Sequence, residues 1–329
     1  MRNARVAPSG LILSVVGADR RCCFLLVSCL LWAIMSKIEQ ELCSQPDIWL
    51  EARDLVSSVE KFLPPAGERV AVFGCGTSLY MAEAAARWRE DAGQGETDAF
   101  ASSEFPSSRS YDACVAISRS GTTTEVLDVL GRISGSTLLI TADRDTAAAQ
   151  VALHTISLPF ADEQSVVQTR FATGFLALWR AHLGHDIEVL ASDGRRSLDA
   201  ELPDNVASYS QFVFLGHGPA GAIAAEAALK MREAAGCWTE AYPSMEFRHG
   251  PISAVGEHTL VWSLDPLDPS LRQEIVTTGA AVTEGAADPM VELLRVQRTA
   301  VKLAVLKGLD PDRPRHLSRS VILTSLGAT

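Results

Sequence analysis

The stretch that decides the fold is VAVFGCGTSLYMAEAAARWR, residues 70–89. A short run of β-branched and aromatic residues leads into a G-x-G turn, and an alanine-rich segment follows. This order predicts a buried strand that ends at a glycine corner and continues into a helix, which is how a βαβ unit begins.

The same pattern occurs again as FVFLGHGPAGAIAAEAALKM, residues 212–231. Gly74 and Gly76 correspond there to Gly216 and Gly218. A repeat of a whole strand–corner–helix unit predicts that the chain contains two copies of one architecture.

Strand-like and helix-like segments alternate along both copies. The expected strands are 113–117, 137–141, 155–158, 211–215 and 260–264, and the expected helices are 122–133, 165–182 and 289–306. This alternation predicts an α/β protein with two doubly wound parallel sheets in tandem, each in a three-layer αβα arrangement. The polar stretch 191–205 is the best linker candidate, so we expect domains at 35–195 and 200–329.

Composition narrows the functional classes. The chain has 329 residues, 47% hydrophobic and 21% charged, with a net charge of -11. This balance is typical of a globular protein and argues against a nucleic-acid partner. The seven cysteines form no CxxC pair, so we expect no metal site, no disulfide framework and a cytoplasmic location. The sequence contains no complete dinucleotide-binding fingerprint, so we expect no cofactor.

The first 34 residues differ from the rest. Arg20 and Arg21 precede an apolar run that is short for a membrane span, so no membrane association is expected. Three interpretations stay open: an extension of the gene model upstream of Met35, a signal or anchor segment, or a structured part of the fold.

Two corners carry hydroxyl groups. Gly76, Thr77 and Ser78 follow the first strand, where free N–H groups and hydroxyls favour an anion, although a G-x-G turn also serves as a plain tight turn. Residues 118–125, SRSGTTTE, follow the next strand and suit a phosphate monoester. The alternative for this segment is a capping box, with Thr122 as the cap and Glu125 completing it. Arg119 is expected to point toward solvent, and no role is assigned to it.

A third candidate combines acids, a lysine and a histidine. Glu226, Lys230 and Glu233 are spaced to share one helix face, which is also typical of a solvated salt-bridge face. His249 precedes a Gly-Pro turn and is a candidate acid/base, although a lone histidine is more often structural.

Together these motifs resemble the SIS (sugar isomerase) domain family, and most closely the isomerase half of glutamine–fructose-6-phosphate aminotransferases. The resemblance extends from Met35 to the C-terminus. It rests on GCGTS (74–78), SRSGTTTE (118–125), the region 168–170, EAYPSMEFRHGP (240–251) and DRPRHLSRSV (312–321). It implies a pair of flavodoxin-like domains, a homodimer, and a hexose 6-phosphate as the small-molecule ligand.

The resemblance also implies roles for individual residues. Glu233 is the base that moves a proton between C1 and C2, Lys230 supports the intermediate, and His249 opens the sugar ring, often from the neighbouring subunit. The residues implied for the substrate and its phosphate are Gly76, Thr77, Ser78, Ser118, Ser120, Thr122, Thr123, Gln168, Thr169 and Arg319.

Three departures from the family pattern shape the expected function. We expect no glutaminase domain in this chain. Gln168 stands where the family has a serine, and Arg319 stands where the family has a lysine that forms a Schiff base, which a guanidinium cannot do. We therefore expect a hexosamine-6-phosphate deaminase/isomerase. The alternatives are a fructosamine-6-phosphate deglycase, an aminotransferase-like isomerase subunit, and a non-catalytic sugar-phosphate sensor.

Overall fold

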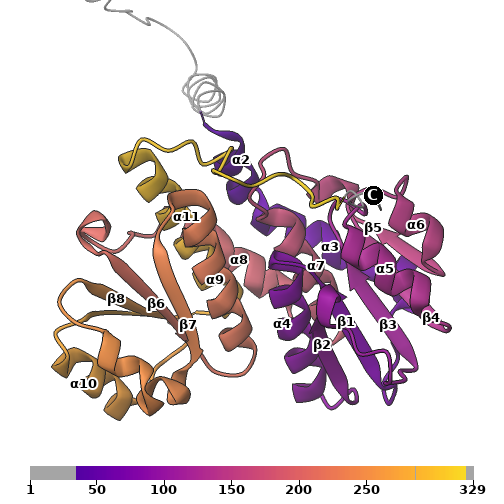
Figure 1. Ribbon diagram of the computed structural model, residues 1–329, viewed down its shortest axis with the longest axis horizontal. Helices are drawn as coiled ribbons and strands as arrows, with labels where there is room; N and C mark the ends of the chain where they lie inside the picture. Colours follow the sequence, from indigo (N-terminus) through magenta and orange to yellow (C-terminus); the bar gives the residue numbers. More distant parts are fainter. Residues whose placement is uncertain (1–34, 286, 324–329) are drawn as a thin grey trace, which may run out of the picture. The chain divides into compact units, whose positions relative to one another are not determined.

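The computed structural model describes residues 35–285 and 287–323. The N-terminal segment 1–34 lies outside the described residues, so the interpretations of that segment remain predictions. The chain from Ser36 onward forms one compact unit that contains two parallel sheets (Figure 1).

The first sheet has five strands in the order β2-β1-β3-β4-β5, and every neighbouring pair is parallel. Its strands are β1 (Val70–Gly74), β2 (Thr97–Ala101), β3 (Ala113–Ile117), β4 (Ser136–Thr141) and β5 (His154–Ser157). The direction of winding reverses between β1 and β3. In a doubly wound sheet, ligands bind at the carboxyl ends of the strands beside this reversal.

Helices accompany this sheet on both faces. They are α2 (Lys37–Cys43), α3 (Gln45–Val59), α4 (Thr77–Asp91), α5 (Thr124–Arg132), α6 (Ala147–Val151), α7 (Arg170–His182) and α8 (Ile187–Asp199). Short 3-10 turns are η1 (Glu60–Phe62), η2 (Ser102–Glu104), η3 (Pro159–Ala161) and η4 (Val206–Ser208). The two hydroxyl-rich corners therefore precede α4 and α5, on either side of the reversal point.

The second sheet has four parallel strands in the order β7-β6-β8-β9. Its strands are β6 (Gln211–Gly216), β7 (Trp238–Pro243), β8 (Thr259–Ser263) and β9 (Ala281–Glu284). Its helices are α9 (Pro219–Ala235), α10 (Pro269–Thr277) and α11 (Pro289–Leu306), with 3-10 turns η5 (Ser244–His249) and η6 (Pro251–Ala254). The α/β class with parallel sheets, expected from the alternating pattern, is confirmed.

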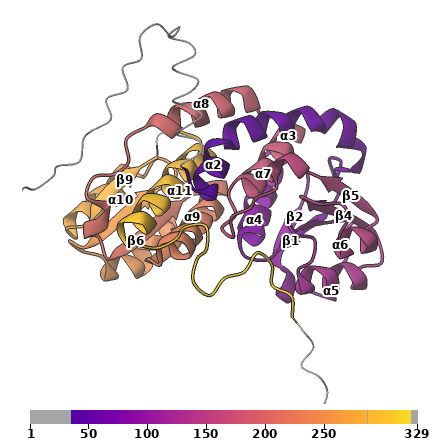
Figure 2. The same ribbon diagram turned by 90° about the horizontal axis from the view of Figure 1, so that it is seen from above.

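Alternating side chains along each central strand enter different cores, because successive residues of a strand point to opposite faces. In β1, Val70 and Val72 pack into the largest core, whereas Ala71 and Phe73 pack against α5 and α6. The largest core also includes one face of β6, and α4 and α9 contact each other within it (Figure 2). Both sheets thus share one core, and a division into two tandem domains near residues 195–200 stays a prediction.

Two local expectations were wrong. The linker candidate 191–205 is helical through Asp199, because Gly194 is a packing position against Trp49 and not a turn. A Cβ at Gly194 would lie 2.6 Å from Trp49 Cζ3. The helix expected from Ser165 begins at Arg170, since the preceding backbone N–H groups bind buried carboxylates instead of helical carbonyls.

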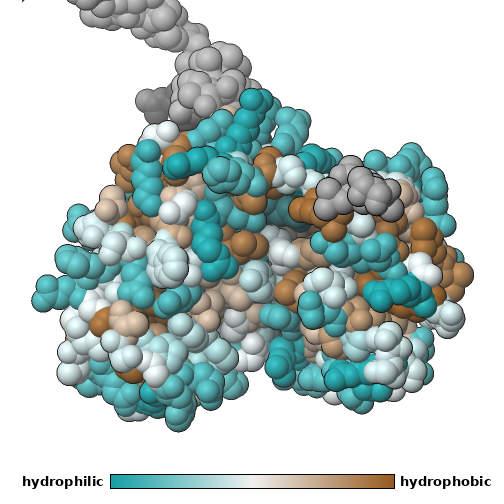
Figure 3. Space-filling view, in the orientation of Figure 1, coloured by the Kyte–Doolittle hydropathy of each residue, from teal (hydrophilic) through white to brown (hydrophobic). Residues whose placement is uncertain are grey.

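The surface mixes hydrophilic and hydrophobic side chains over the face shown in Figure 3. Among the described residues, no helix has the length and apolar character needed to cross a bilayer. The same residues contain no cluster of three or more side chains suited to hold a metal ion.

Candidate active site

The corner between β1 and α4 depends on two glycines. A Cβ at Gly74 would lie 2.5 Å from Ser78 Cβ, so only glycine allows the first turn of α4 to approach the end of β1. Gly76 has φ 56° and ψ -124°, a conformation that side chains with a Cβ rarely adopt. Thr77 and Ser78 begin α4 and are both buried.

Across from this corner, α9 carries a buried lysine between two acids. Lys230 Nζ lies 2.5 Å from Glu233 Oε2 and 3.3 Å from Glu226 Oε1. It also donates a hydrogen bond of 2.9 Å to Thr77 Oγ1. The lysine side chain is 1% exposed, so this helix face is not the solvated salt-bridge face that the sequence left open. Glu233 remains 19% exposed and is the accessible member of the cluster.

Burial and neighbouring charges shift the pKa values of Glu226 and Lys230. Burial raises the pKa of Glu226 to about 8, and Lys230 only partly offsets this. Burial alone would lower the pKa of Lys230, but the neighbouring Glu226 and Glu233 outweigh it and the net pKa is raised. Within the described part of the chain, neither oxygen of Glu226 meets hydrogen-bond geometry. The cluster therefore combines a buried acid of raised pKa, a buried lysine and a second acid that remains accessible.

The second corner, between β3 and α5, gathers hydroxyl groups. The Gly121 N–H donates to Ser118 Oγ at 3.2 Å, and Thr122 Oγ1 donates to Ser120 Oγ at 3.1 Å. Gly121 has φ 60°, and a Cβ there would overlap Thr146. The capping-box interpretation is wrong: Thr123 is the N-cap of α5, and its side chain makes no capping hydrogen bond. The hydroxyl of Thr122 instead faces Ser120.

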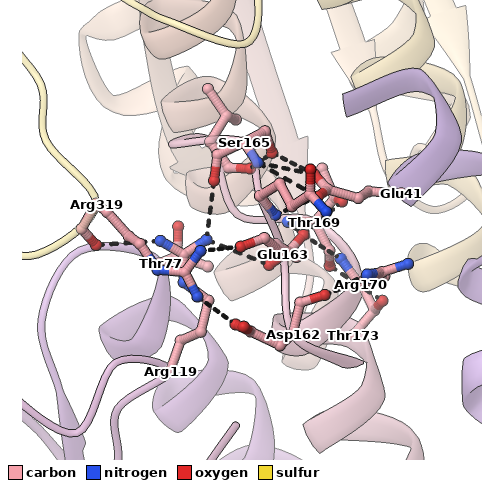
Figure 4. Close-up of polar contacts among 12 residues, drawn as sticks. Glu41, Thr77, Arg119, Asp162, Glu163, Ser165, Thr169, Arg170, Thr173 and Arg319 are labelled. Atoms are coloured by element: carbon pink, nitrogen blue, oxygen red, sulfur yellow. Dashed lines mark hydrogen bonds and ion pairs between the residues drawn. The ribbon is translucent and has the colours of Figure 1, made fainter. Parts of the chain in front are cut away.

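Arg119 is buried and does not point toward solvent. Its Nη1 donates to Ser165 O at 3.2 Å and lies 3.6 Å from Glu163 Oε2, while its Nη2 donates to Arg319 O at 3.1 Å (Figure 4). Burial lowers the pKa of Arg119, and Glu163 opposes this change. Arg119 thus connects the hydroxyl-rich corner to the segment before α7 and to the C-terminal tail.

The residues expected around the sugar on the α7 side are mostly engaged within the protein. Thr169 is fully buried, and its hydroxyl donates to Glu163 Oε1 at 2.7 Å. Gln168 has a buried Oε1 that meets no hydrogen-bond partner among the described residues. The Arg319 guanidinium pairs with Asp162 and donates to Glu163 O, and within the described residues it makes no hydrogen bond to the hydroxyls of the second corner (Figure 4).

His249 belongs to a different element from the α9 cluster. It ends η5 and is exposed, and in the described residues it makes no hydrogen bond or ion pair with Glu233 or Lys230. The structure therefore brings Thr77, Lys230 and Glu233 of the expected set into contact, and the role of His249 stays a prediction.

Three contributions escaped the sequence analysis. Glu41 and Glu163 are buried carboxylates that bind the backbone between η3 and α7, at Ser165 and Thr169 respectively. Burial raises the pKa of Glu41. The hydroxyl oxygen of Ser320 lies 3.1 Å from Ser120 Oγ. Their roles depend on partners more than 100 positions away for Glu41 and Ser320, so residue type and local spacing did not single them out.

Sequence and structure comparisons find similar proteins whose names refer to sugar phosphates. No family model matches the chain. The sequence is 27% identical over 321 residues to a glutamine–fructose-6-phosphate aminotransferase (isomerizing) from Caulobacter vibrioides, covering 77% of this chain and 52% of the relative. The chain thus spans about half the length of that curated relative.

Solved structures extend the comparison to the fold. A glucosamine-6-phosphate deaminase from Thermotoga maritima superposes with a TM-score of 0.73 at 25% identity, covering 88% of this chain and all of the other. A tagatose-6-phosphate ketose/aldose isomerase from Escherichia coli gives a TM-score of 0.72 at 18% identity, covering 89% and 98%. The resemblance of this chain to the SIS domain family, first indicated by its motifs, is therefore confirmed in both sequence and fold.

Proposed function

We propose that this protein is a sugar-phosphate isomerase/deaminase that acts on a hexosamine 6-phosphate. The observation that carries the proposal is the buried Glu226–Lys230–Glu233 cluster of α9, hydrogen-bonded to Thr77 at the first corner. Buried, mutually perturbed acids and bases beside a ligand-binding corner are typical of sites that transfer protons.

The second corner is proposed as the phosphate site. Ser118, Ser120, Thr122 and Thr123 supply hydroxyl groups at the start of α5, where backbone N–H groups and the helix dipole favour an anion. Thr123 supports this assignment because its hydroxyl is not used for capping. Binding energy from the phosphate would orient the carbonyl end of the sugar, which would lie along Gly76, Thr77, Ser78 and Gln168.

Glu233 is proposed as the base that takes the proton from the carbon next to the carbonyl or imine and returns it to the adjacent carbon. Lys230 would stabilise the negative oxygen of the intermediate. The raised pKa of Glu226, caused by its burial, supports the proposal, because such shifts are typical of sites that transfer protons. With water, loss of the amino group yields ammonia and a ketose phosphate.

Ring opening is assigned to His249, supplied by the partner subunit of a homodimer. An exposed histidine that forms, among the described residues, no hydrogen bond or ion pair with the α9 cluster fits this arrangement. Thr169 and Arg319 would act as positioning residues, because their side chains bind Glu163 and Asp162. We place the enzyme in the cytoplasm, with tandem domains divided near residues 195–200 and no metal, cofactor, nucleic acid or membrane required.

A second candidate is an isomerase subunit that receives ammonia from another protein. The similarity to the aminotransferase from Caulobacter vibrioides favours it, since the chain spans about half of that relative. In this case the same cluster would run the proton transfers in the direction that forms the amino sugar.

An ammonia-release assay tests the proposal directly. The full chain is incubated with glucosamine, galactosamine and fructosamine 6-phosphates, and ammonia is measured by a coupled assay. Release from an aldohexosamine 6-phosphate supports the deaminase, and release only from fructosamine 6-phosphates would replace it with a deglycase. Isomerisation without ammonia supports the subunit. Binding without any turnover would identify a sensor and overturn the proposed activity.

A further inference from the structure

The end of the described chain lies along the proposed phosphate corner. We define the C-terminal strap as residues 317–323, which follow α11 and cross to the N-terminal end of α5 (Figure 1). Thr124 N–H donates to Val321 O at 3.4 Å, and Leu323 N–H donates to Thr124 Oγ1 at 2.9 Å. These contacts join segments almost 200 positions apart in the sequence.

Within this contact, three hydroxyl groups form a ring. Ser120 Oγ donates to Ser320 Oγ at 3.1 Å, and Thr122 Oγ1 lies 3.0 Å from Ser320 Oγ and 3.1 Å from Ser120 Oγ. A hydroxyl both donates and accepts, so the three satisfy one another in the absence of an anion. A phosphate dianion accepts only, and each hydroxyl can rotate to donate to it.

The strap is held by contacts that do not involve the Ser320 side chain. Arg119 donates to Arg319 O, and the Arg319 guanidinium pairs with Asp162. Since these anchors immediately precede Ser320, they fix its hydroxyl beside the corner. Hydrogen bonds to a charged acceptor are about twice as strong as those between neutral groups, so exchanging the ring for phosphate contacts is favourable.

We propose that Ser320 is a further ligand-binding residue of this site, supplying an additional hydroxyl donor to a phosphate monoester held by Ser120, Thr122 and the other hydroxyls of the corner. The inference rests on the proposed function, because it assumes that the corner binds the phosphate of the sugar. It assigns the strap a specificity role: phosphorylated sugars gain this contact, and free sugars do not.

The test is a calorimetric titration of the full chain with fructose 6-phosphate, inorganic phosphate and fructose. Ser320→Ala should raise the Kd for fructose 6-phosphate and for phosphate about 10-fold, with no change for fructose. Ser320→Thr keeps the hydroxyl and should stay within about 3-fold of the wild type. Ser318→Ala is the matched control, since its hydroxyl donates to Ser320 O and does not touch the corner.

The outcomes separate this inference from the function on which it depends. An unchanged Kd in Ser320→Ala would overturn the role of Ser320 while leaving the phosphate corner in place. Tighter binding would also overturn it, because Ser320 would then be an occupant that phosphate displaces. Equal losses in Ser318→Ala and Ser320→Ala would overturn it as well, because they would assign the effect to strap order. A wild-type chain that binds neither phosphorylated probe would overturn the proposed function itself.

Discussion

Gly76 and Gly218 occupy equivalent corners of the two sheets and have nearly the same backbone, φ 56° and ψ -124° against φ 55° and ψ -126°. The residues directly after the two glycines differ: Thr77 and Ser78 begin α4, whereas Pro219 and Ala220 begin α9. The first corner therefore carries hydroxyls, and the second carries none.

The helices that follow these corners also differ in the residues that they carry at equivalent positions. Counted from the two glycines, the positions of Glu226, Lys230 and Glu233 in α9 are Ala84, Trp88 and Asp91 in α4. The α9 residues form the buried ion cluster, while Asp91 is exposed. In the proposed function, one repeated scaffold thus provides the binding groups at its first copy and the acid–base groups at its second, and α4 and α9 are in contact.

The largest expected effect comes from the acid–base copy. Glu233→Gln should lower kcat by about 10³-fold, since a general base is removed, while fructose 6-phosphate still binds. The matched change Asp91→Asn at the equivalent position of α4 should leave kcat unchanged. Steady-state kinetics with the best substrate of the ammonia-release panel measures both, and an unaltered kcat in Glu233→Gln would remove this residue from the mechanism.

The next largest effect is expected on the affinity for phosphorylated sugars, when hydroxyl groups of the second corner are removed. Ser120→Ala combined with Thr123→Ala should raise the Kd of phosphorylated sugars about 100-fold, equivalent to about 3 kcal/mol, because two donors to a charged group are lost. Unphosphorylated sugars provide the internal control. Equal weakening of both ligand types, measured by calorimetry, would show that this corner is not the phosphate site.

The two glycines themselves offer a matched pair. A Cβ at Gly76 or Gly218 would meet no atom within 4 Å, so alanine at either position is penalised by backbone conformation alone. Each substitution should lower the free energy of unfolding by about 1–3 kcal/mol, and by similar amounts. Only Gly76→Ala should also weaken sugar-phosphate binding. Urea denaturation and ligand titration of both variants provide the comparison, and equal binding losses would contradict it.

The smallest expected loss of activity comes from the hydrogen bond between Lys230 of α9 and Thr77 of α4. Thr77→Val removes the acceptor for Lys230 and should lower kcat about 10-fold, while Glu233 still holds the lysine. Thr77→Ser retains the hydroxyl and should recover most of the rate. A Thr77→Val variant with wild-type kcat and raised KM would instead make Thr77 a binding residue only.

Much of the fold was predictable where the pattern of residues within one segment indicates a strand or a helix. Strand β3 and helix α11 have the expected bounds, because a fully buried parallel strand is a continuous apolar run and α11 begins at a capped proline. Strands β2, β7 and β9 escaped the sequence analysis. They lie at edges of the sheets, and most of their residues are partly exposed, so their sequences lack a clear period.

The candidate site was predictable only in part. The face shared by Glu226, Lys230 and Glu233 follows from helical spacing, but their burial depends on the packing of α4 against α9. Arg319 was chosen from the tail, whereas its neighbour Ser320 contacts the hydroxyl corner. Adjacent residues of an extended segment point in opposite directions, so the register of the tail decides between them.

Local sequence is enough to specify the central strands, the glycine corners and the residue types placed after them, because glycine conformation, apolar runs and helical spacing are local properties. Packing in three dimensions selects which of these groups are buried together. Lys230 meets Thr77, Arg119 meets the tail, and Ser320 meets Ser120 across 153 to 200 positions of sequence. Charge state and ligand geometry depend on such packing, since burial and neighbouring charges set them and no local pattern encodes either.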